Sequence, residues 1–321
     1  MGMIIFALGT VVPAILLGLA AAGGGLWPVL AILSIWAFKS AQAPLAIFAA
    51  PDHDPDIEFP ATAEHATLLA VLHFVLLFIV IWAIGGASGL GVLERLAVLI
   101  TGALYFAQIS HPNALELIHN DDTTQEQIGK AVFSSLLYGP FASSYPLVHD
   151  VHAATDDDPF SAASGESFYA YCLRVTIGSA RAGFAAENLR RAQTPPTGIA
   201  RFMHPYVGYV ASAGIALLVS MMIAGLGGLI ALLAVSALTQ MQVLLRFYVR
   251  HFGLRRAQLA DGTFEPLGPQ HNWGMTTRFS EALMLFALRL VDDRTSTSEH
   301  IKDLLSDEAK SPKLPHAPMV M

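Results

Sequence analysis

The stretch TLLAVLHFVLLFIVIWAIGG, residues 67–86, contains no Asp, Glu, Lys or Arg. Its length matches the roughly 20 apolar residues that an α-helix needs to cross the hydrocarbon core of a bilayer. The rest of the chain is similar in character, because 54% of its residues are hydrophobic, 13% are charged and the mean hydropathy is +0.53. Soluble domains contain about 25% charged residues. The sequence therefore predicts an all-α integral membrane protein.

Six predominantly apolar windows, three of them with one or two charged residues, predict six transmembrane helices. They lie at about residues 3–23, 26–47, 67–86, 91–109, 206–222 and 227–247. The glycine-rich break GLGG at 225–228 separates the last two, because glycine weakens a helix interior. The first window lacks the basic region of a signal peptide, so we expect it to be retained as a span.

The basic residues indicate the orientation of these helices. Lys and Arg are concentrated in residues 110–205 and 248–321, and they are absent from the tight connections near Gly24, Ala87 and Gly225. Since basic segments stay in the cytoplasm, we expect both chain termini there, in a bacterial-type inner membrane. Residues 110–205 and 248–300 would form a cytoplasmic helical cap, followed by a Pro-rich tail at 301–321.

The polar segments contain further helical patterns. Amphipathic spacing predicts helices at 125–138 and 166–191, and another near 279–290. The acidic run Asp156–Asp158 is expected to be a solvated loop. The net charge of −7, without a basic patch interleaved with aromatic residues, predicts no nucleic-acid partner. The single Cys172 excludes an intrachain disulfide and any metal site built from cysteines.

The sequence NALELIHNDD, residues 113–122, places Glu116 and His119 one helical turn apart. Both side-chain types bind metals, and at this spacing they share one helix face. A site of the H-E-x-x-H type would need a histidine at position 115, where the chain has Leu115. A carboxylate-bridged di-iron bundle would need a second E-x-x-H motif, which the chain lacks.

Three more stretches contain potential ligands at the polar ends of the predicted spans. They are SSYPLVHDVHAATDDDP at 143–159, FYVRHFGL at 247–254 and LRLVDDRT at 288–295. Together with LELIHND at 115–121, they resemble the histidine boxes of the membrane-bound alkane monooxygenases, which belong to the superfamily of membrane fatty acid desaturases and hydroxylases. The same family is indicated by GESFYAYCLR at 165–174, ADGTFE at 260–265, QHNW at 270–273 and KLPHAP at 313–318.

This resemblance implies a fatty-acid-desaturase-like arrangement of six membrane helices with a cytoplasmic cap. It also implies two non-haem irons bound by boxes of the form H-E-x-x-H, E-H-x-x-x-H-H, N-Y-x-E-H-Y-G-L and R-H-x-D-H-H. The histidines that remain at these positions are His119, His149 and His251. Other residues occupy the remaining ligand positions: Leu115, Tyr145, Asp150, Val291, Arg294 and Thr295. Arg250 replaces the glutamate of the third box.

Leucine and valine do not bind metals, and arginine brings a fixed positive charge that it does not lose. We therefore expect no intact di-iron centre, and at most one metal ion. In one interpretation a polar network replaces the irons, formed by Glu116, Arg250, Arg294, Asp292 and Asp293, with Asp150 as another acid. In the other, the three histidines hold one metal ion, with Asp150, His152 or Asp293 as helpers.

The two interpretations predict different functions. The polar network predicts a catalytically silent relative that acts as a subunit or lipid-binding protein, beside a membrane-protein partner or an active paralogue. The single-metal site predicts an active hydroxylase or desaturase of alkyl chains. The resemblance then implies oxygen as a substrate and electrons from a rubredoxin-like carrier. His271 and Trp273 are expected to have a packing role in either case.

Overall fold

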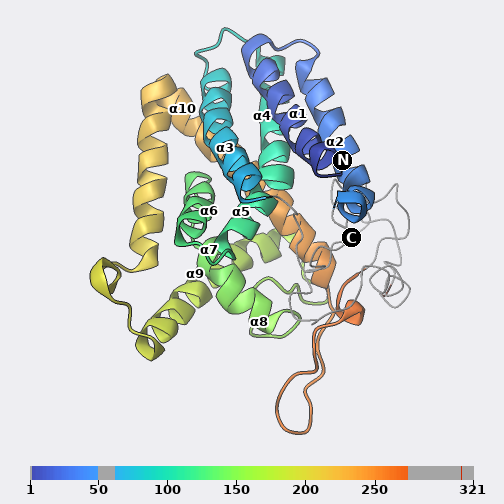
Figure 1. Cartoon of the computed structure of the whole chain (residues 1–321), viewed down its shortest axis with the longest axis vertical. Helices are drawn as coiled ribbons and strands as arrows, with labels where there is room; N and C mark the ends of the chain where they lie inside the picture. The colour runs from blue at the N-terminus through green and yellow to red at the C-terminus, as the bar shows by residue number, and fades with distance from the viewer. Residues whose placement is uncertain (1, 50–61, 274–311, 313–321) are drawn as a thin grey trace. The chain divides into compact units, whose positions relative to one another are not determined.

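The computed structural model describes residues 2–49, 62–273 and 312, and the regular elements in these ranges are helices (Figure 1). An isolated bridge between Gln258 and Phe264 is the β-type pairing found there. This confirms the predicted all-α class. The chain divides into two compact units, which are described separately.

Unit 1 comprises residues 1–50, 59–142 and 195–242. Its elements are α1 Gly2–Gly23, α2 Trp27–Ala49, α3 Ala63–Ile84, α4 Val92–Tyr105, the π-helix η1 Phe106–Ser110, α5 His111–Ile118, α6 Thr123–Ser135, the 3-10 helix η3 Gly198–Arg201 and most of α10 Pro205–His251. Helix α1 packs against α2 and α3, and α4 packs against the same two helices. The core between them is aliphatic and aromatic, with Leu17, Leu77 and Phe106 fully buried.

Four of the described helical segments are long and apolar enough to cross a membrane. They are Phe6–Gly23, Ala63–Ile84, Val92–Ile118 and Pro205–His251. Helix α2 contributes a shorter apolar stretch, Trp27–Lys39. Helix α10 is one of these four segments, although the sequence predicts two spans within it. The predicted number of six spans is therefore not confirmed and stays a prediction.

Helix α10 is interrupted at Ala224 and Gly225, where the backbone leaves helical geometry. Gly225 has φ +58° and ψ −139°, a conformation that glycine adopts far more easily than other residues. A Cβ at Gly227 or Gly228 would collide with the carbonyl groups of Gly85 and Ser220. The GLGG sequence is therefore explained by a kink and by close backbone contacts.

Side-chain caps fix the starts of α6 and α9. Asp122 Oδ1 accepts from Thr124 N at 2.7 Å at the start of α6, which lies where a helix was predicted at 125–138. Ser167 Oγ accepts from Ala170 N at 3.4 Å at the start of α9. These bonds satisfy backbone donors that have no partner inside the helix.

Unit 2 comprises residues 51–58, 143–194 and 243–321, of which 143–194, 243–273 and 312 are described. Its elements are the end of α7 Phe141–Ser144, the π-helix η2 Tyr145–His149, α8 Asp150–His152, α9 Phe168–Gln193, the end of α10 and the 3-10 helix η4 Pro269–His271. Helix α9 lies where the sequence predicts one at 166–191. The chain after α10 bonds to the loop after α8, through Gly253 N to Ala162 O at 3.0 Å and Arg256 N to Ala154 O at 2.8 Å.

Candidate functional site

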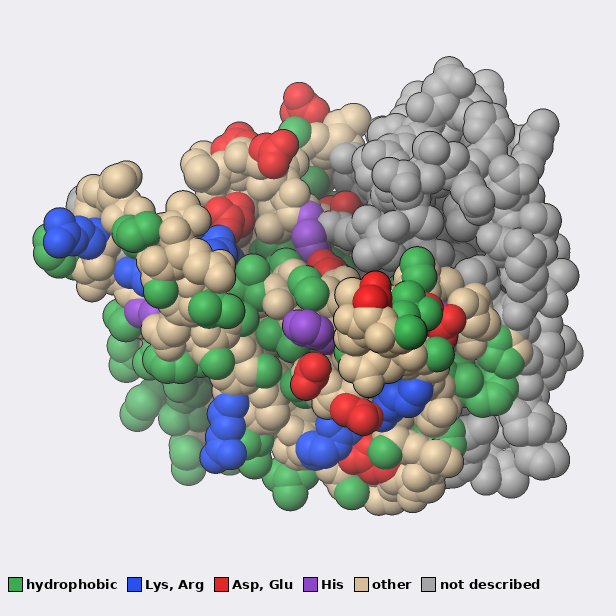
Figure 2. Space-filling view, turned by 90° about the horizontal axis from the view of Figure 1, so that it is seen from below, with side chains coloured by type: hydrophobic (Ala, Val, Ile, Leu, Met, Phe, Trp, Pro, Cys, Tyr) green, Lys and Arg blue, Asp and Glu red, His purple; other side chains and the backbone are tan. Residues whose placement is uncertain are grey.

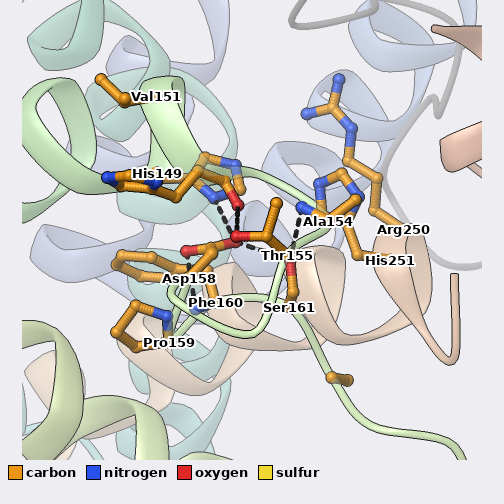
Figure 3. A network of polar contacts seen from close by, with 12 residues as sticks. His149, Val151, Ala154, Thr155, Asp158, Pro159, Phe160, Ser161, Arg250 and His251 are labelled. Atoms are coloured by element: carbon orange, nitrogen blue, oxygen red, sulfur yellow. Dashed lines mark hydrogen bonds and ion pairs between the residues drawn. The ribbon is translucent and has the colours of Figure 1, made fainter. Parts of the chain in front are cut away.

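Two of the retained box histidines lie together in unit 2. His149 ends η2 and His251 ends α10, and their ring centroids are 5.4 Å apart (Figure 3). Both side chains are buried, and Phe247 and Phe160 pack against the His149 ring. The π-helical turn is unusual, and such turns occur often at functional sites.

Asp158 is the partner of His149. His149 Nδ1 lies 2.9 Å from Asp158 Oδ2, and the same oxygen accepts from Ser161 Oγ at 2.6 Å (Figure 3). Asp158 Oδ1 accepts from Phe160 N at 3.0 Å. Ser161 Oγ in turn accepts from Ala154 N at 2.8 Å, and Ala154 has the positive φ of +59° that is uncommon outside glycine. The loop 153–161 is therefore folded around one buried carboxylate.

The predicted solvated loop at Asp156–Asp158 is wrong for Asp158. Asp156 and Asp157 are exposed, but Asp158 is only 2% exposed. The charge run hid this difference, because three adjacent aspartates give no pattern that singles out the third. Ser161 was likewise missed. The run TDDDP at 155–159 is part of the family resemblance, and this could have indicated a structural role for its aspartates. A loop that is only solvated does not need such a fixed sequence.

The charge of Asp158 follows from its surroundings. Burial raises the pKa of a carboxyl group, but the charge of His149 and hydrogen bonds from His149 and Ser161 outweigh this effect and hold the pKa of Asp158 below its usual value. Asp158 is therefore a carboxylate at neutral pH and accepts hydrogen bonds only. It follows that His149 Nδ1 bears the proton that is donated to it.

The other two retained histidines have the same proton arrangement. His251 Nδ1 lies 3.1 Å from the carbonyl oxygen of His271, and His119 Nδ1 lies 2.8 Å from that of Leu115. Since a carbonyl oxygen accepts only, both Nδ1 atoms donate. His251 Nε2 is buried and has no hydrogen-bond partner within the described residues. This arrangement, with Nδ1–H fixed by an acceptor, is the one that metal-binding histidines adopt.

The segment QHNW at 270–273 supports the end of α10. Trp273 N donates to Arg250 O at 3.0 Å and Trp273 Nε1 donates to Phe252 O at 2.6 Å. His271 Nδ1 accepts from Gly268 N at 3.0 Å, and its Nε2 lies 3.0 Å from Glu265 Oε1. Both nitrogens of His271 are thus used within the fold, which agrees with the predicted packing role.

The remaining predicted site residues fall into three groups. Leu115, in unit 1, and Tyr145, in unit 2, are fully buried. Glu116, Asp150 and His152 are half-buried. Val291, Asp292, Asp293, Arg294 and Thr295 lie outside the described residues.

Arg250 is buried, and its Nε donates to Asn272 Oδ1 at 3.2 Å. Its predicted pairing with an aspartate stays a prediction, as does the pairing of Arg294. His119 belongs to unit 1, whereas His149 and His251 belong to unit 2. The predicted cluster of all three histidines is therefore untested.

The donors of the described residues do not fit a di-iron centre. Across residues 2–49 and 62–273, no three His, Cys, Asp or Glu side chains are grouped so that they could hold a metal ion. Unit 2 supplies the imidazoles of His149 and His251, and the nearby carboxylate of Asp158 already accepts three hydrogen bonds. Two irons need two filled coordination shells, which this set does not provide.

The comparisons with known proteins agree with the fold. The sequence profile of the fatty acid desaturase family matches residues 116–288, which is more than half of the chain. The chain belongs to this family, and its all-helical structure is of the fatty-acid-desaturase type. The family implies a non-haem di-iron cofactor.

Several curated alkane monooxygenases are similar to this chain. Alkane 1-monooxygenase 2 of Pseudomonas aeruginosa is 26% identical over 63% of this chain and 53% of its own length. Alkane 1-monooxygenase 2 of Alcanivorax borkumensis is 23% identical over 81% and 69%. Alkane 1-monooxygenase of Acinetobacter baylyi is 27% identical over 63% and 49%. The matches thus cover about half to two thirds of the length of these relatives.

Proposed function

We propose that this chain is an alkane-monooxygenase-like membrane protein that does not assemble the di-iron centre of its family. It would act as a catalytically silent subunit or as a lipid-binding protein, beside a membrane-protein partner or an active paralogue. The supporting observation is the hydrogen-bond network at Asp158. Its buried carboxylate accepts hydrogen bonds from His149, Ser161 and the backbone amide of Phe160. A buried charge is costly unless it is paired and hydrogen-bonded, and here both conditions are met by protein groups.

The residues at the altered ligand positions support the same proposal. Leu115 and Tyr145 are each fully buried, so each fills the space at a ligand position with a side chain that is not a histidine. Arg250 adds a buried positive charge next to His251 in the sequence. The family resemblance further supports an alkyl chain or membrane lipid as the bound molecule. The absence of Lys and Arg from the tight connections near Gly24, Ala87 and Gly225 supports an inner membrane with both chain termini in the cytoplasm.

A second function is favoured by the proton arrangement of the histidines. His119, His149 and His251 all donate from Nδ1, which is the proton arrangement that metal-binding histidines adopt. Three such imidazoles are a common set for one zinc or iron ion. The chain would then be a hydroxylase or desaturase of alkyl chains with an altered metal site. It would use oxygen and a rubredoxin-like electron donor.

A reconstituted activity assay separates the two functions. The purified chain and an active alkane 1-monooxygenase are supplied in parallel with alkane, oxygen, rubredoxin and its reductase, and oxidised products are quantified by gas chromatography. The silent-relative proposal predicts product from the control enzyme and none from this chain. Turnover that is lost in His149→Ala but kept in Asp157→Asn, a change at an exposed neighbour, would overturn it in favour of the altered metal site.

A further inference from the structure

Helix α9 has an apolar stripe on its exposed surface. Tyr169, Leu173, Ile177 and Phe184 are 82%, 67%, 46% and 47% exposed. Their spacing of i, i+4, i+8 and i+15 places them on one face of a helix with 3.6 residues per turn. Large exposed apolar side chains gathered in this way mark an interaction surface more often than scattered ones do.

An adjacent side of α9 is already packed within unit 2. Its buried residues are Tyr171, Val175, Ser179, Gly183 and Glu187. Tyr171 Oη donates to Phe160 O at 2.8 Å. Glu187 accepts from Ser143 Oγ at 2.9 Å and from Arg190. The helix is therefore fixed by one face while the adjacent apolar stripe is accessible.

Helix α9 contains more basic than acidic residues. The helix contains four arginines, and its single acidic residue is the buried Glu187. Arg174, Arg181 and Arg190 are exposed. Arg174 pairs with Glu166 at 2.7 Å and Arg190 with Glu187 at 2.8 Å, whereas Arg181 has no ion pair among the described residues. Helix α9 thus has an excess of positive charge in a chain whose net charge is −7. Figure 2 shows basic side chains in blue beside both hydrophobic ones in green and acidic ones in red on the face seen from below.

The chain also connects α9 to a helix that can cross a membrane. Residues 194–204 lead from the end of α9 to the start of α10. In this connection Phe202 is 84% exposed and Met203 is 50% exposed. The C-terminal end of α9 is thus tethered by a short apolar-rich connection to a candidate span.

We propose that α9 lies in the headgroup region of the bilayer, with its apolar stripe in the acyl boundary and the exposed Arg181 bound to anionic phospholipids. An apolar helix face bordered by basic side chains is typical of interfacial helices. The long arginine side chain reaches from the apolar boundary to the phosphates. This proposal is independent of whether the chain binds a metal. A soluble acidic protein on the same face is the competing occupant, and the test distinguishes it.

Depth-dependent quenching tests the position of the stripe. Burial raises the pKa of the Cys172 thiol to about 11, and Cys172→Ser gives a cysteine-free full chain for labelling. Single cysteines replace Leu173 or Ile177 on the stripe, and Ala185, an exposed residue on another side of α9, serves as the matched control. Each variant is labelled with a small fluorophore in nanodiscs of phosphatidylcholine with about a third phosphatidylglycerol.

The stripe positions should be quenched by doxyl lipids and shielded at least several-fold from aqueous iodide. The control position should show the reverse. Iodide access at the stripe equal to that at the control would overturn the proposal. So would shielding that persists in detergent without phospholipid, because another part of the chain would then cover the stripe. Shielding in nanodiscs only after addition of a soluble acidic protein would likewise overturn it.

The charge requirement is tested with Arg181, which is exposed on α9. One basic residue near an anionic surface changes binding by roughly five-fold. Arg181→Gln should therefore lower the ratio of lipid-quenched to iodide-accessible label in phosphatidylglycerol nanodiscs by about this factor, while Arg181→Lys should not. The difference should vanish in pure phosphatidylcholine. Equal effects of both substitutions, or no dependence on the anionic lipid, would contradict the role of Arg181.

Discussion

Removal of the Asp158 carboxylate should destabilise unit 2 strongly. Asp158 is fully buried as a side chain and pairs with His149, which is 2% exposed. Asp158→Ala leaves the His149 imidazole, the Ser161 hydroxyl and the Phe160 amide without their hydrogen-bond acceptor. Breaking a buried pair from one side costs about 3–5 kcal/mol. Asp158→Asn keeps an acceptor for the amide and should cost less, about 1–3 kcal/mol.

The assay is equilibrium unfolding in mixed micelles, followed by tryptophan fluorescence. Asp157→Asn is the matched control, because Asp157 is exposed and such a change shifts stability by about 0.5 kcal/mol or less. The pH dependence gives a second readout. The pKa of Asp158 is lowered in the fold, so its stabilisation is present above the unfolded pKa of about 3.9. It is lost as the pH falls through the lower folded pKa.

The parent should therefore lose more stability than Asp158→Asn as the pH falls below about 4. The pKa of Glu166 is also lowered, mainly by its hydrogen bond with Arg174. Glu166 is present in both proteins, so its effect cancels in the difference in stability between the parent and Asp158→Asn. If Asp158→Ala costs no more than Asp157→Asn, or if parent and Asp158→Asn respond equally to acid, the account of the network is refuted.

Three further results are expected. Reporter fusions at Gly24, Ala87 and Gly225 should report a periplasmic location, and a fusion at Gln193 a cytoplasmic one; a cytoplasmic report at Ala87 would reverse the proposed topology. Gly225→Ala should cost about 1–3 kcal/mol in unfolding experiments, because φ +58° with ψ −139° is a conformation that residues other than glycine rarely adopt, whereas Gly214→Ala, with open space around its Cβ position, should not destabilise. A chelator should leave the melting temperature of the purified parent unchanged, and a drop that is absent from a variant with alanine at all three box histidines would reveal a bound metal.

The helical class and several helix positions could be predicted because they depend on local pattern. Charge-free windows and amphipathic spacing act over one or two dozen residues, and α3, α6 and α9 follow from them directly. The Asp158 network could not be predicted in this way. Its bonds depend on a loop in which Ala154 adopts a positive φ and on the packing of that loop against the end of α10, and neither feature has a local sequence signature.

The family resemblance also has a limit as a guide to the candidate ligand residues. The family resemblance indicated which histidines remain, and His149 and His251 do lie together. The resemblance did not indicate that Asp158, rather than a nearer residue such as Asp150, bonds to His149. A one-dimensional motif records ligand positions, whereas the orientation of a histidine is set by its hydrogen-bond partner.

The iron content of the purified chain decides whether the di-iron centre is lost, as we propose. The protein is made in iron-replete cells beside an active alkane 1-monooxygenase, and iron and zinc per chain are measured by mass spectrometry. We expect far less than two irons per chain, unchanged in His149→Ala, while the control enzyme retains its iron. Iron near two per chain that is lost in His149→Ala would contradict this proposal.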